Sequence, residues 1–374
     1  MRSLLFICLL SLTMSQTGNW GYGYADLLND LDLWAASPWV TIDSIGASVQ
    51  NRALWELTIT DTAPGVKSTV YIHVRTHPNE VQSFWVTEAF IDLLLSDDPY
   101  AGDMRRTCTF YIIPMYNPDG VELGYPRQNA HQIDIESNWD DAVLEPEPAA
   151  LQQRFSQLMS STEPIRIALN MHAAYGGNPR YFVYHHENGT SAEYAALEQV
   201  FIAGVRSYFP TGIGPWDTFV SWTGGTPDQY PESWWWFNYG SEVMALTYED
   251  WNNADAGQFD STAYALLHGI GDYLDYTLDT TPLTGLPQGF RLYQNYPNPL
   301  NATTRIPFTI LRTGVYTLDI YDARGRLVES LFQGRLSKGK QVITWISDAV
   351  PSGLYFYRLT GSSGSGTRKM TVLK

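Results

Sequence analysis

The spacing of hydrophobic residues changes period along the chain and predicts alternating strands and helices. Residues Ser68–Arg75 are β-branched and aromatic, which predicts a short buried strand. From Val81 to Leu93 hydrophobic residues recur every four positions, which predicts an amphipathic helix. A polar segment, His77-Pro-Asn-Glu80, lies between the two elements. The first clear unit of the chain is therefore a strand, a polar turn and a helix.

The same alternation continues through the first three quarters of the chain. Further strands are predicted at 54–59, 109–113, 165–171 and 242–248, and further helices at 25–34, 152–159, 193–208 and 261–274. Strands that alternate with helices build βαβ units. The predicted fold class of this part is therefore α/β, with a mixed twisted sheet flanked by helices.

Past residue 279 the pattern changes to short alternating segments separated by turns. Strands are predicted at 306–311, 315–321, 327–332, 341–346, 354–359 and 369–373. Such a series predicts a small immunoglobulin-like β-sandwich. The predicted domains are a signal peptide at 1–15, an α/β domain at 16–279, a Pro/Gly/Thr linker at 280–289 and the β-sandwich at 290–374.

The first residues have the layout of a secretory signal. Arg2 supplies a basic start, Leu4–Met14 forms a short hydrophobic run, and small residues follow. The run is too short to span a bilayer comfortably, and no other run approaches that length. The alternative is a buried N-terminal helix. After signal removal the chain keeps one cysteine, Cys108, for which we expect a buried, inert thiol.

The composition and net charge of the chain limit the kinds of macromolecule that it is expected to bind. The chain has 374 residues, of which 44% are hydrophobic and 17% charged, as in globular proteins. Its formal net charge is −16, without a long run of one sign. A surface of this sign does not attract a phosphate backbone or anionic lipid, which argues against nucleic acid and anionic membranes as partners.

The polar turn between the first strand and helix carries candidate metal ligands. Neutral imidazole and carboxylate are ligands of catalytic zinc, so His77 and Glu80 could share one ion. The alternative is an ordinary polar turn with Glu80 favoured at a helix N-terminus. His172 could supply a third ligand, because it also follows a buried strand. We expect His268 to pack within its helix and His185 to form a solvated pair with its neighbour.

Six short motifs occur in the order found in zinc carboxypeptidases of the M14 family. They are Ile45-Gly-Ala-Ser, His77-Pro-Asn-Glu80, Tyr116-Asn-Pro-Asp-Gly120, Arg127-Gln-Asn-Ala130, His172 and Thr247-Tyr-Glu249. The chain most resembles the branch whose zinc motif reads H-x-N-E and whose next block reads R-x-N-A. The resemblance covers residues 19–276 and implies a zinc carboxypeptidase-like fold.

The resemblance implies a role for each matching residue. His77, Glu80 and His172 correspond to the ligands of one Zn²⁺ ion. Glu249 corresponds to the general base, and Arg127 to the arginine that polarises the scissile carbonyl and holds the oxyanion. Asn117–Gly120 is expected to be a turn that shapes the pocket.

The family also has a flexible tyrosine that closes over the substrate. Gly224–Tyr230 resembles that block, so Tyr230 is the candidate and Tyr239 the alternative. The aromatic run Trp234–Phe237 lies between them and could line a binding cleft, although aromatic clusters are more often core.

The chain departs from the family at the residues that bind the terminal carboxylate of the substrate. Where the family has D-x-N-R, this chain reads Asp134-Ile-Glu136-Ser137. An arginine fork binds a carboxylate by two charge-assisted hydrogen bonds, whereas Glu136 and Ser137 offer no positive charge. We therefore expect a preference for a cationic or uncharged group there, or a substitute cation from Arg180.

The predicted β-sandwich resembles a type A sorting domain of the type IX secretion system. The resemblance covers residues 290–374 and rests on the segments Leu292–Pro299, Tyr321–Gly325, Ser352–Tyr357 and Lys369–Lys374. It implies an address that the export machinery reads. The alternative is a passive or carbohydrate-binding β-sandwich.

Taken together, these features predict a secreted zinc metallopeptidase of carboxypeptidase type. Its expected partners are a peptide or protein substrate and the type IX secretion machinery, without an integral membrane segment once the signal is removed. One alternative is a zinc amidase or peptidase that ignores the terminal carboxylate, for instance on cell-wall peptides. Another is a catalytically silent binding protein on the same fold.

Overall fold

A computed structural model describes residues 20–176, 179–278, 290–293, 295, 297–310, 313–361 and 364–374. The predicted signal peptide at 1–15 and linker at 280–289 lie outside the described residues.

A seven-stranded mixed sheet forms the centre of the N-terminal part, with strand order β1-β2-β4-β3-β5-β9-β6. The strands are β1 Val40–Ala47, β2 Ala53–Ile59, β3 Ser68–Val74, β4 Cys108–Ile113, β5 Ile165–Ala174, β6 Tyr181–Phe182 and β9 Met244–Trp251. Neighbouring pairs among β4, β3, β5 and β9 are parallel, and the remaining pairs are antiparallel. The predicted mixed sheet is confirmed.

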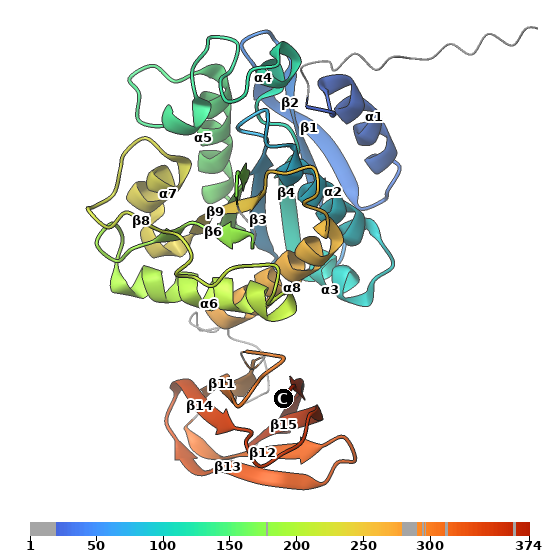
Figure 1. The fold of residues 1–374 in the computed structure, drawn as a ribbon, viewed down its shortest axis with the longest axis vertical. Helices are drawn as coiled ribbons and strands as arrows, with labels where there is room; N and C mark the ends of the chain where they lie inside the picture. The colour runs from blue at the N-terminus through green and yellow to red at the C-terminus, as the bar shows by residue number, and fades with distance from the viewer. Residues whose placement is uncertain are drawn as a thin grey trace, which may run out of the picture.

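Helices cover both faces of this sheet, and Figure 1 shows α2 and α3 on one side and α5 and α7 on the other. One face packs against α1 Tyr24–Trp34, α2 Val81–Leu95, α3 Pro99–Thr107, α6 Ala192–Tyr208 and α8 Phe259–Leu278. The opposite face packs against α5 Pro146–Met159 and α7 Pro231–Tyr239. Because both faces are covered, every residue of β3 is buried, as in the middle of a parallel sheet.

Several short elements were not predicted. Helix α3 is mostly polar and begins where Asp98 accepts hydrogen bonds from the backbone N–H groups of Tyr100 and Ala101. Helix α7 is a run of aromatic residues without a clear helical period. The short strands β7 Tyr184–His185 and β8 Val220–Ser221 form a separate parallel pair. The two strands are too short to leave a periodic signal in the sequence.

The segment predicted as a pocket-shaping turn begins helix α4, Pro118–Leu123. Asn117 caps this helix, because its Oδ1 accepts a hydrogen bond from the N–H of Gly120 at 3.0 Å. The prediction of a simple turn at 117–120 is therefore wrong. The cause is local: Pro at the first helical position and an asparagine cap start a helix as readily as a turn.

The C-terminal residues form two antiparallel sheets around a separate hydrophobic core. One sheet contains β10 Phe290–Leu292, β11 Thr303–Ile310 and β14 Gly339–Ile346, and the other contains β13 Leu327–Leu336, β12 Gly314–Asp322, β15 Gly353–Gly361 and β16 Gly364–Val372. Alternate residues of each sheet, such as Leu318 and Ile320, are fully buried. The predicted β-sandwich is confirmed.

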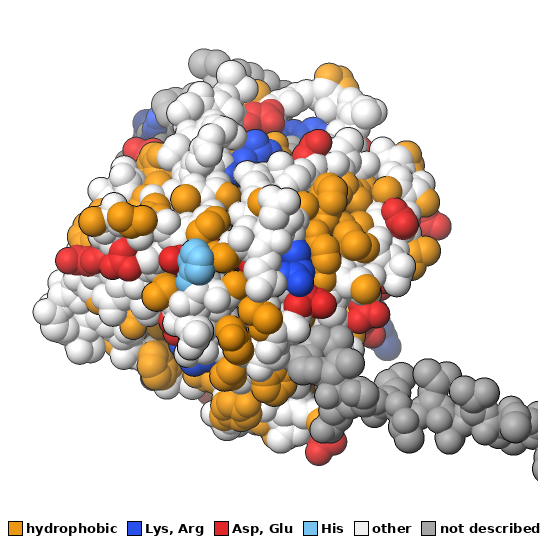
Figure 2. Space-filling model, turned by 90° about the horizontal axis from the view of Figure 1, so that it is seen from above, with side chains coloured by type: hydrophobic (Ala, Val, Ile, Leu, Met, Phe, Trp, Pro, Cys, Tyr) orange, Lys and Arg blue, Asp and Glu red, His pale blue; other side chains and the backbone are white. Residues whose placement is uncertain are grey.

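The described surface carries mixed charges. In Figure 2 carboxylates and basic side chains are scattered among hydrophobic and polar groups, and this face has no continuous basic patch. Within the described ranges, no helix has the length and hydrophobicity needed to cross a bilayer. Cys108 has a free and buried thiol, and burial raises its pKa to about 12, as expected for an inert thiol.

Candidate metal centre

The candidate site lies at the carboxyl ends of β3, β5 and β9, on the face that α5 and α7 cover. Successive side chains of a strand point to opposite faces, so Asn170 and His172 share one face of β5. His172 and Glu249 are register partners on the neighbouring strands β5 and β9. His77 and Glu80 reach the same edge from the loop that follows β3. Strand ends of an α/β sheet thus bring together residues that are far apart in the chain.

The loop that carries His77 and Glu80 is held from beneath by a buried arginine. Arg75 is fully buried with φ +62°, and its Nη2 donates a hydrogen bond to the carbonyl of Pro78 at 2.6 Å. The N–H of Glu80 donates to the carbonyl of His77 at 3.1 Å, which closes a tight turn at the start of α2. This turn directs both side chains to the same side of the loop.

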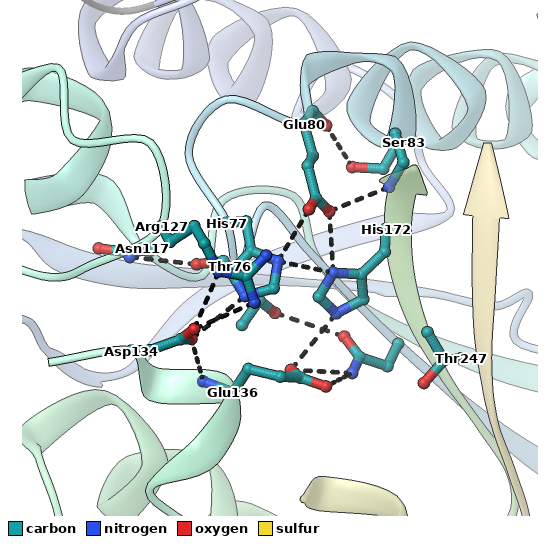
Figure 3. A network of polar contacts seen from close by, with 12 residues as sticks. Thr76, His77, Glu80, Ser83, Asn117, Arg127, Asp134, Glu136, His172 and Thr247 are labelled. Carbon is teal, nitrogen blue, oxygen red and sulfur yellow. Dashed lines mark hydrogen bonds and ion pairs between the residues drawn. The ribbon is translucent and has the colours of Figure 1, made fainter. Parts of the chain in front are cut away.

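Three potential ligand atoms converge in a buried cluster, which Figure 3 shows from close by. His77 Nδ1 lies 2.8 Å from Glu80 Oε1, and His172 Nδ1 lies 2.8 Å from Glu80 Oε2. The two Nδ1 atoms are 3.1 Å apart. Ligand atoms from all three residues lie within 4.8 Å of one another. Two imidazole nitrogens and a carboxylate at these distances form a donor set that fits one zinc ion.

The Nε2 atom of each histidine, which points away from the cluster of ligand atoms, faces a carboxylate. His77 Nε2 lies 3.1 Å from Asp134 Oδ1. His172 Nε2 lies 3.3 Å from Glu136 Oε2, although its angle is not that of a good hydrogen bond. A carboxylate that holds Nε2–H leaves Nδ1 unprotonated and free to bind a metal. A carboxylate facing Nε2 therefore favours, in both histidines, the tautomer that a metal site at their Nδ1 atoms requires.

The pKa values of His172 and Glu249 are shifted by burial and by the charges that face each side chain. Burial alone would lower the pKa of His172, but Glu136 and Glu80 raise it well above its ordinary value. Burial raises the pKa of Glu249 to about 8, with Glu80 and Glu136 adding to the rise and His172 and His77 opposing it. Glu249 Oε2 is buried and has no hydrogen-bond partner among the described residues. Such a carboxylate is suited to accept a proton.

Arg127 lies at the exposed rim of the cluster. Its Nε and Nη2 atoms both lie 3.0 Å from Asp134 Oδ2, while Asp134 Oδ1 faces His77. Half of the Arg127 side chain is exposed. Asp134 therefore connects a potential metal ligand to a guanidinium that faces solvent.

The structure does not bring all predicted site residues to the cluster. Ser137 is exposed, whereas Glu136 is buried. Arg180 is buried and donates from Nε to Asp250 Oδ2 at 2.8 Å, and from Nη2 to the carbonyl of Ala256 at 2.9 Å. Because Asp250 follows Glu249 in β9, its side chain points to the opposite face. Arg180 therefore faces away from the cluster, and its Nε and Nη2 groups already donate to Asp250 and to backbone carbonyls.

The aromatic candidates divide between core and surface. Tyr230 is half-buried and immediately precedes α7. Tyr239 packs on Trp234 and Trp235, with ring centroids 5.7 and 5.5 Å apart. Trp235 is buried in the core beneath α7, and Phe237 is exposed. Within the run Trp234–Phe237, Trp235 therefore belongs to the core.

The sequence interpretation missed Tyr181, which lies near the cluster, and it was wrong about His185. Tyr181 is the register partner of Glu249, and burial, with Glu249 and Glu80, raises its pKa to about 12. It lies in a two-residue strand, too short for a periodic signal. His185 was expected in a solvated pair, but it is buried with Nδ1 2.8 Å from Glu198 Oε1. That expectation is wrong because α6 supplies a partner from 13 residues further along the chain.

Two family models match this chain. The zinc carboxypeptidase model matches residues 31–194, and the secretion system C-terminal sorting domain model matches residues 294–373. The chain carries a zinc carboxypeptidase domain and a sorting domain. The matched part of the zinc carboxypeptidase domain includes His77, Glu80, Arg127 and His172, and Glu249 lies beyond it. The first model describes a family of zinc carboxypeptidases, and the second describes a sorting domain of secretion systems.

The zinc carboxypeptidase domain is also similar to parts of curated relatives. Cytosolic carboxypeptidase 6 of Mus musculus is 38% identical over 112 residues, which cover 29% of this chain and 20% of that protein. Cytosolic carboxypeptidase 2 of Xenopus tropicalis is 30% identical over 142 residues, which cover 36% of this chain and 15% of that protein. The chain spans less than half of the length of these relatives.

Solved structures share the fold of the zinc carboxypeptidase domain. A metallo-carboxypeptidase from Burkholderia cenocepacia has a TM-score of 0.58 and 20% identity, and the match covers 68% of this chain and 70% of that chain. A metallo-carboxypeptidase from Pseudomonas aeruginosa, in complex with (2-guanidinoethylmercapto)succinic acid, has a TM-score of 0.58 and 20% identity, with 69% of each chain covered. At this identity the likeness shows the fold.

Proposed function

We propose that this chain is a secreted zinc-dependent metallopeptidase of carboxypeptidase type. The observation that carries the proposal is the convergence of His77, Glu80 and His172 in one buried cluster with Glu249 on the adjoining strand. Two imidazole Nδ1 atoms 3.1 Å apart beside a carboxylate are best accommodated around a cation. The domain family supports zinc as that cation.

Each residue of the cluster has a role that follows from its position. His77 Nδ1, His172 Nδ1 and the Glu80 carboxylate would hold the zinc ion. Bound zinc would supply the acidity that turns water into a nucleophile at neutral pH. Glu249 would accept the proton of the attacking water on its unpaired Oε2 and deliver it to the leaving amine.

Arg127 would hold the carbonyl oxygen of the scissile bond as negative charge develops on it. Its guanidinium lies at the rim of the cluster and is oriented by Asp134 at 3.0 Å. Half of its surface is exposed, so a substrate can reach it. Such preorganised donors stabilise the transition state more than the ground state.

We further propose that recognition of the free C-terminus differs from that of typical relatives. The position of the family's arginine is held by Ser137, and the predicted substitute Arg180 is paired with Asp250. The carboxylates of Glu136, Glu249 and Asp134 surround the cluster. These observations favour a substrate with an uncharged or cationic group next to the scissile bond, and they support the related alternative of an amidase or peptidase that ignores the terminal carboxylate.

A peptide-library digest analysed by mass spectrometry tests the proposal. The purified protein is incubated with the library with and without a chelator, and one peptide is supplied as a matched pair of free acid and C-terminal amide. We expect chelator-sensitive cleavage, with the amide cleaved at least as well as the acid. A strong preference for the acid would refute the altered recognition. Stoichiometric zinc without turnover of any peptide would instead indicate a binding protein.

For the C-terminal part we propose that residues 290–374 are the address for the type IX machinery and that the chain is released outside the cell or held at its surface. The sorting-domain match at 294–373 supports this proposal. The same match favours an address over a carbohydrate-binding role. The proposed boundaries are 1–15 for the signal, 16–279 for the catalytic domain and 280–289 for the linker.

A further inference from the structure

We propose that Glu136 is a positioning residue for the metal ligand His172, and that it pairs with that histidine as Asp134 pairs with His77. The inference rests on the proposed metal site and deepens it. In this proposal Glu136 orients His172. It does not contact the substrate, although its position in the sequence would suggest that contact.

The two carboxylates come from one short segment. Asp134 immediately precedes the 3₁₀ turn Ile135–Ser137, and its Oδ1 accepts a hydrogen bond from the N–H of Glu136 at 3.1 Å. From this segment Asp134 reaches His77 Nε2 at 3.1 Å, and Glu136 reaches His172 Nε2 at 3.3 Å. One turn of the chain therefore places a carboxylate behind each histidine.

The Glu136 carboxylate is fixed by the strand that carries His172. Asn170 Nδ2 donates to both Glu136 oxygens at 3.1 Å, and Asn170 shares a face of β5 with His172. The hydroxyl of Thr76 donates to Asn170 Oδ1 at 3.3 Å, which sets the amide so that its NH₂ group faces the carboxylate. Figure 3 shows Glu136 reaching toward His172 within this network.

Burial separates Glu136 from an incoming substrate. Its side chain is only 10% exposed, whereas the neighbouring Ser137 is exposed. His172 Nε2 is buried and forms no well-aligned hydrogen bond among the described residues, and the Glu136 carboxylate lies within ion-pair distance of it, at 3.3 Å. A buried imidazole N–H needs an acceptor, and the Glu136 carboxylate is the one that the fold supplies.

This contact gives a physical reason for a glutamate at the position where the family pattern D-x-N-R has asparagine. A carboxylate that accepts a hydrogen bond from Nε2–H of a ligating histidine fixes the orientation of the ring. It also makes Nδ1 a stronger ligand for the metal. Loss of such a partner typically lowers metal affinity by about 10- to 100-fold. The chain thus has a carboxylate on both histidines and no cation at Ser137 to anchor a terminal carboxylate.

Zinc affinity of the full-length protein tests the assignment without relying on activity. The zinc dissociation constant is measured by competition with a chromophoric chelator, and the Co²⁺-substituted protein is compared by visible absorption. We expect E136A to raise the dissociation constant by about 10- to 100-fold and E136Q, which keeps a neutral acceptor, by a smaller factor. D134N serves as the benchmark for the equivalent contact at His77.

Glu232 provides a matched control. It is also a buried acid that accepts a hydrogen bond from Asn170 Nδ2, at 3.2 Å, but its other described hydrogen bond comes from Thr247 and not from a ligand histidine. We expect E232Q to leave the zinc dissociation constant within about threefold of wild type. If E136A does not fold, as judged by circular dichroism, E136Q decides the question.

The outcomes separate this inference from the proposed function. If wild type does not bind zinc, the proposed function fails. If D134N weakens zinc binding but E136A and E136Q do not, and instead the KM for peptides changes, Glu136 contacts substrate and the present inference is overturned. If E232Q lowers the zinc affinity as much as E136Q does, the effect is general to buried acids around Asn170. The specific role of Glu136 is then also overturned.

Discussion

Single side chains at the metal centre depend on burial and on the charges opposite them. Glu249 is buried beside two histidines and two acids, and its pKa of about 8 reflects mainly the loss of solvent. Arg75 is fully buried, and its Nη2 holds the ligand loop through the carbonyl of Pro78. Neither environment can be reproduced by a residue of different charge or length. Predictions at this scale therefore concern one functional group at a time.

Replacement of Glu249, the proposed general base, by glutamine should preserve the candidate metal site and remove the proton acceptor. We expect kcat to fall by about 10²- to 10⁴-fold, because glutamine cannot accept the proton of the attacking water. The zinc content, measured by atomic absorption, should stay at one ion per chain. The control E187Q changes an exposed acid and should leave kcat unchanged. Full activity in E249Q would assign the base to another residue.

Helices and strands are joined at the site by a few buried polar contacts. Asp119 of α4 is fully buried and accepts hydrogen bonds from Ser48 Oγ at 2.7 Å, the N–H of Gln50 at 2.6 Å and Arg52 Nη1 at 2.6 Å. These donors belong to the connection between β1 and β2. The contacts place α4 against the sheet edge, close to the loop that carries the metal ligands.

Replacement of Asp119 by alanine should destabilise the fold. Three donors would lose their acceptor, and we expect the free energy of unfolding to fall by about 2–3 kcal/mol. Urea unfolding followed by fluorescence measures this change. The control E122A removes an exposed acceptor on the same helix, which bonds the N–H of Tyr24, and should cost less than about 1 kcal/mol. Equal effects of both variants would contradict a specific role for Asp119.

An acidic group between α1 and α2 should make stability depend on pH. Burial, with Asp30 and Asp92, raises the pKa of Glu88 from 4.5 to about 7. The folded state then binds more protons than the unfolded state between these values. This contribution to stability is full below pH 4.5 and is lost as the pH rises through 7.

The variant E88Q should therefore raise the Tm relative to wild type at pH 8 and do so much less at pH 5. Thermal unfolding followed by circular dichroism at both pH values provides the measurement. D140N, which neutralises an exposed acid, serves as the control. A Tm difference between E88Q and wild type that is the same at both pH values would show that Glu88 does not titrate as inferred.

At the scale of the whole molecule, hydrophobic burial occurs in separate cores. The core clusters of the carboxypeptidase domain contain no residue beyond 274, and the core of the sorting domain runs from Phe290 to Val372. Domains with their own cores can unfold and function independently. Catalysis and export should therefore be separable.

Deletion of residues 290–374 should abolish export and leave peptide cleavage intact. The truncated protein, purified from cells, is expected to keep the kcat/KM of the full chain, because no described residue of the deleted part belongs to the candidate metal centre. Fractionation of a producing strain, followed by immunoblotting, should find the truncated chain inside the cell envelope and the full chain outside. Loss of cleavage on truncation would show that the two parts act together.

Much of this architecture was predictable because its signals are local. The strand at 68–75 and the helix from Val81 were predicted to within about one residue of β3 and α2, since each has a long run of one period. The order of the motifs pointed to His77, Glu80 and His172, and these three residues do converge. Helices α3 and α7 were missed because a polar segment and an aromatic run carry no such period.

The sequence by itself determined the division into an α/β part and a β-sandwich and pointed to a candidate ligand set, because period, turn residues and motif order can be read along the chain. Only the tertiary structure decided the direction of Arg180, the contact of Glu136 with His172 and the pairing of Tyr181 with Glu249. These depend on strand register and on packing between residues dozens of positions apart, and no local pattern encodes which face of a strand meets which loop.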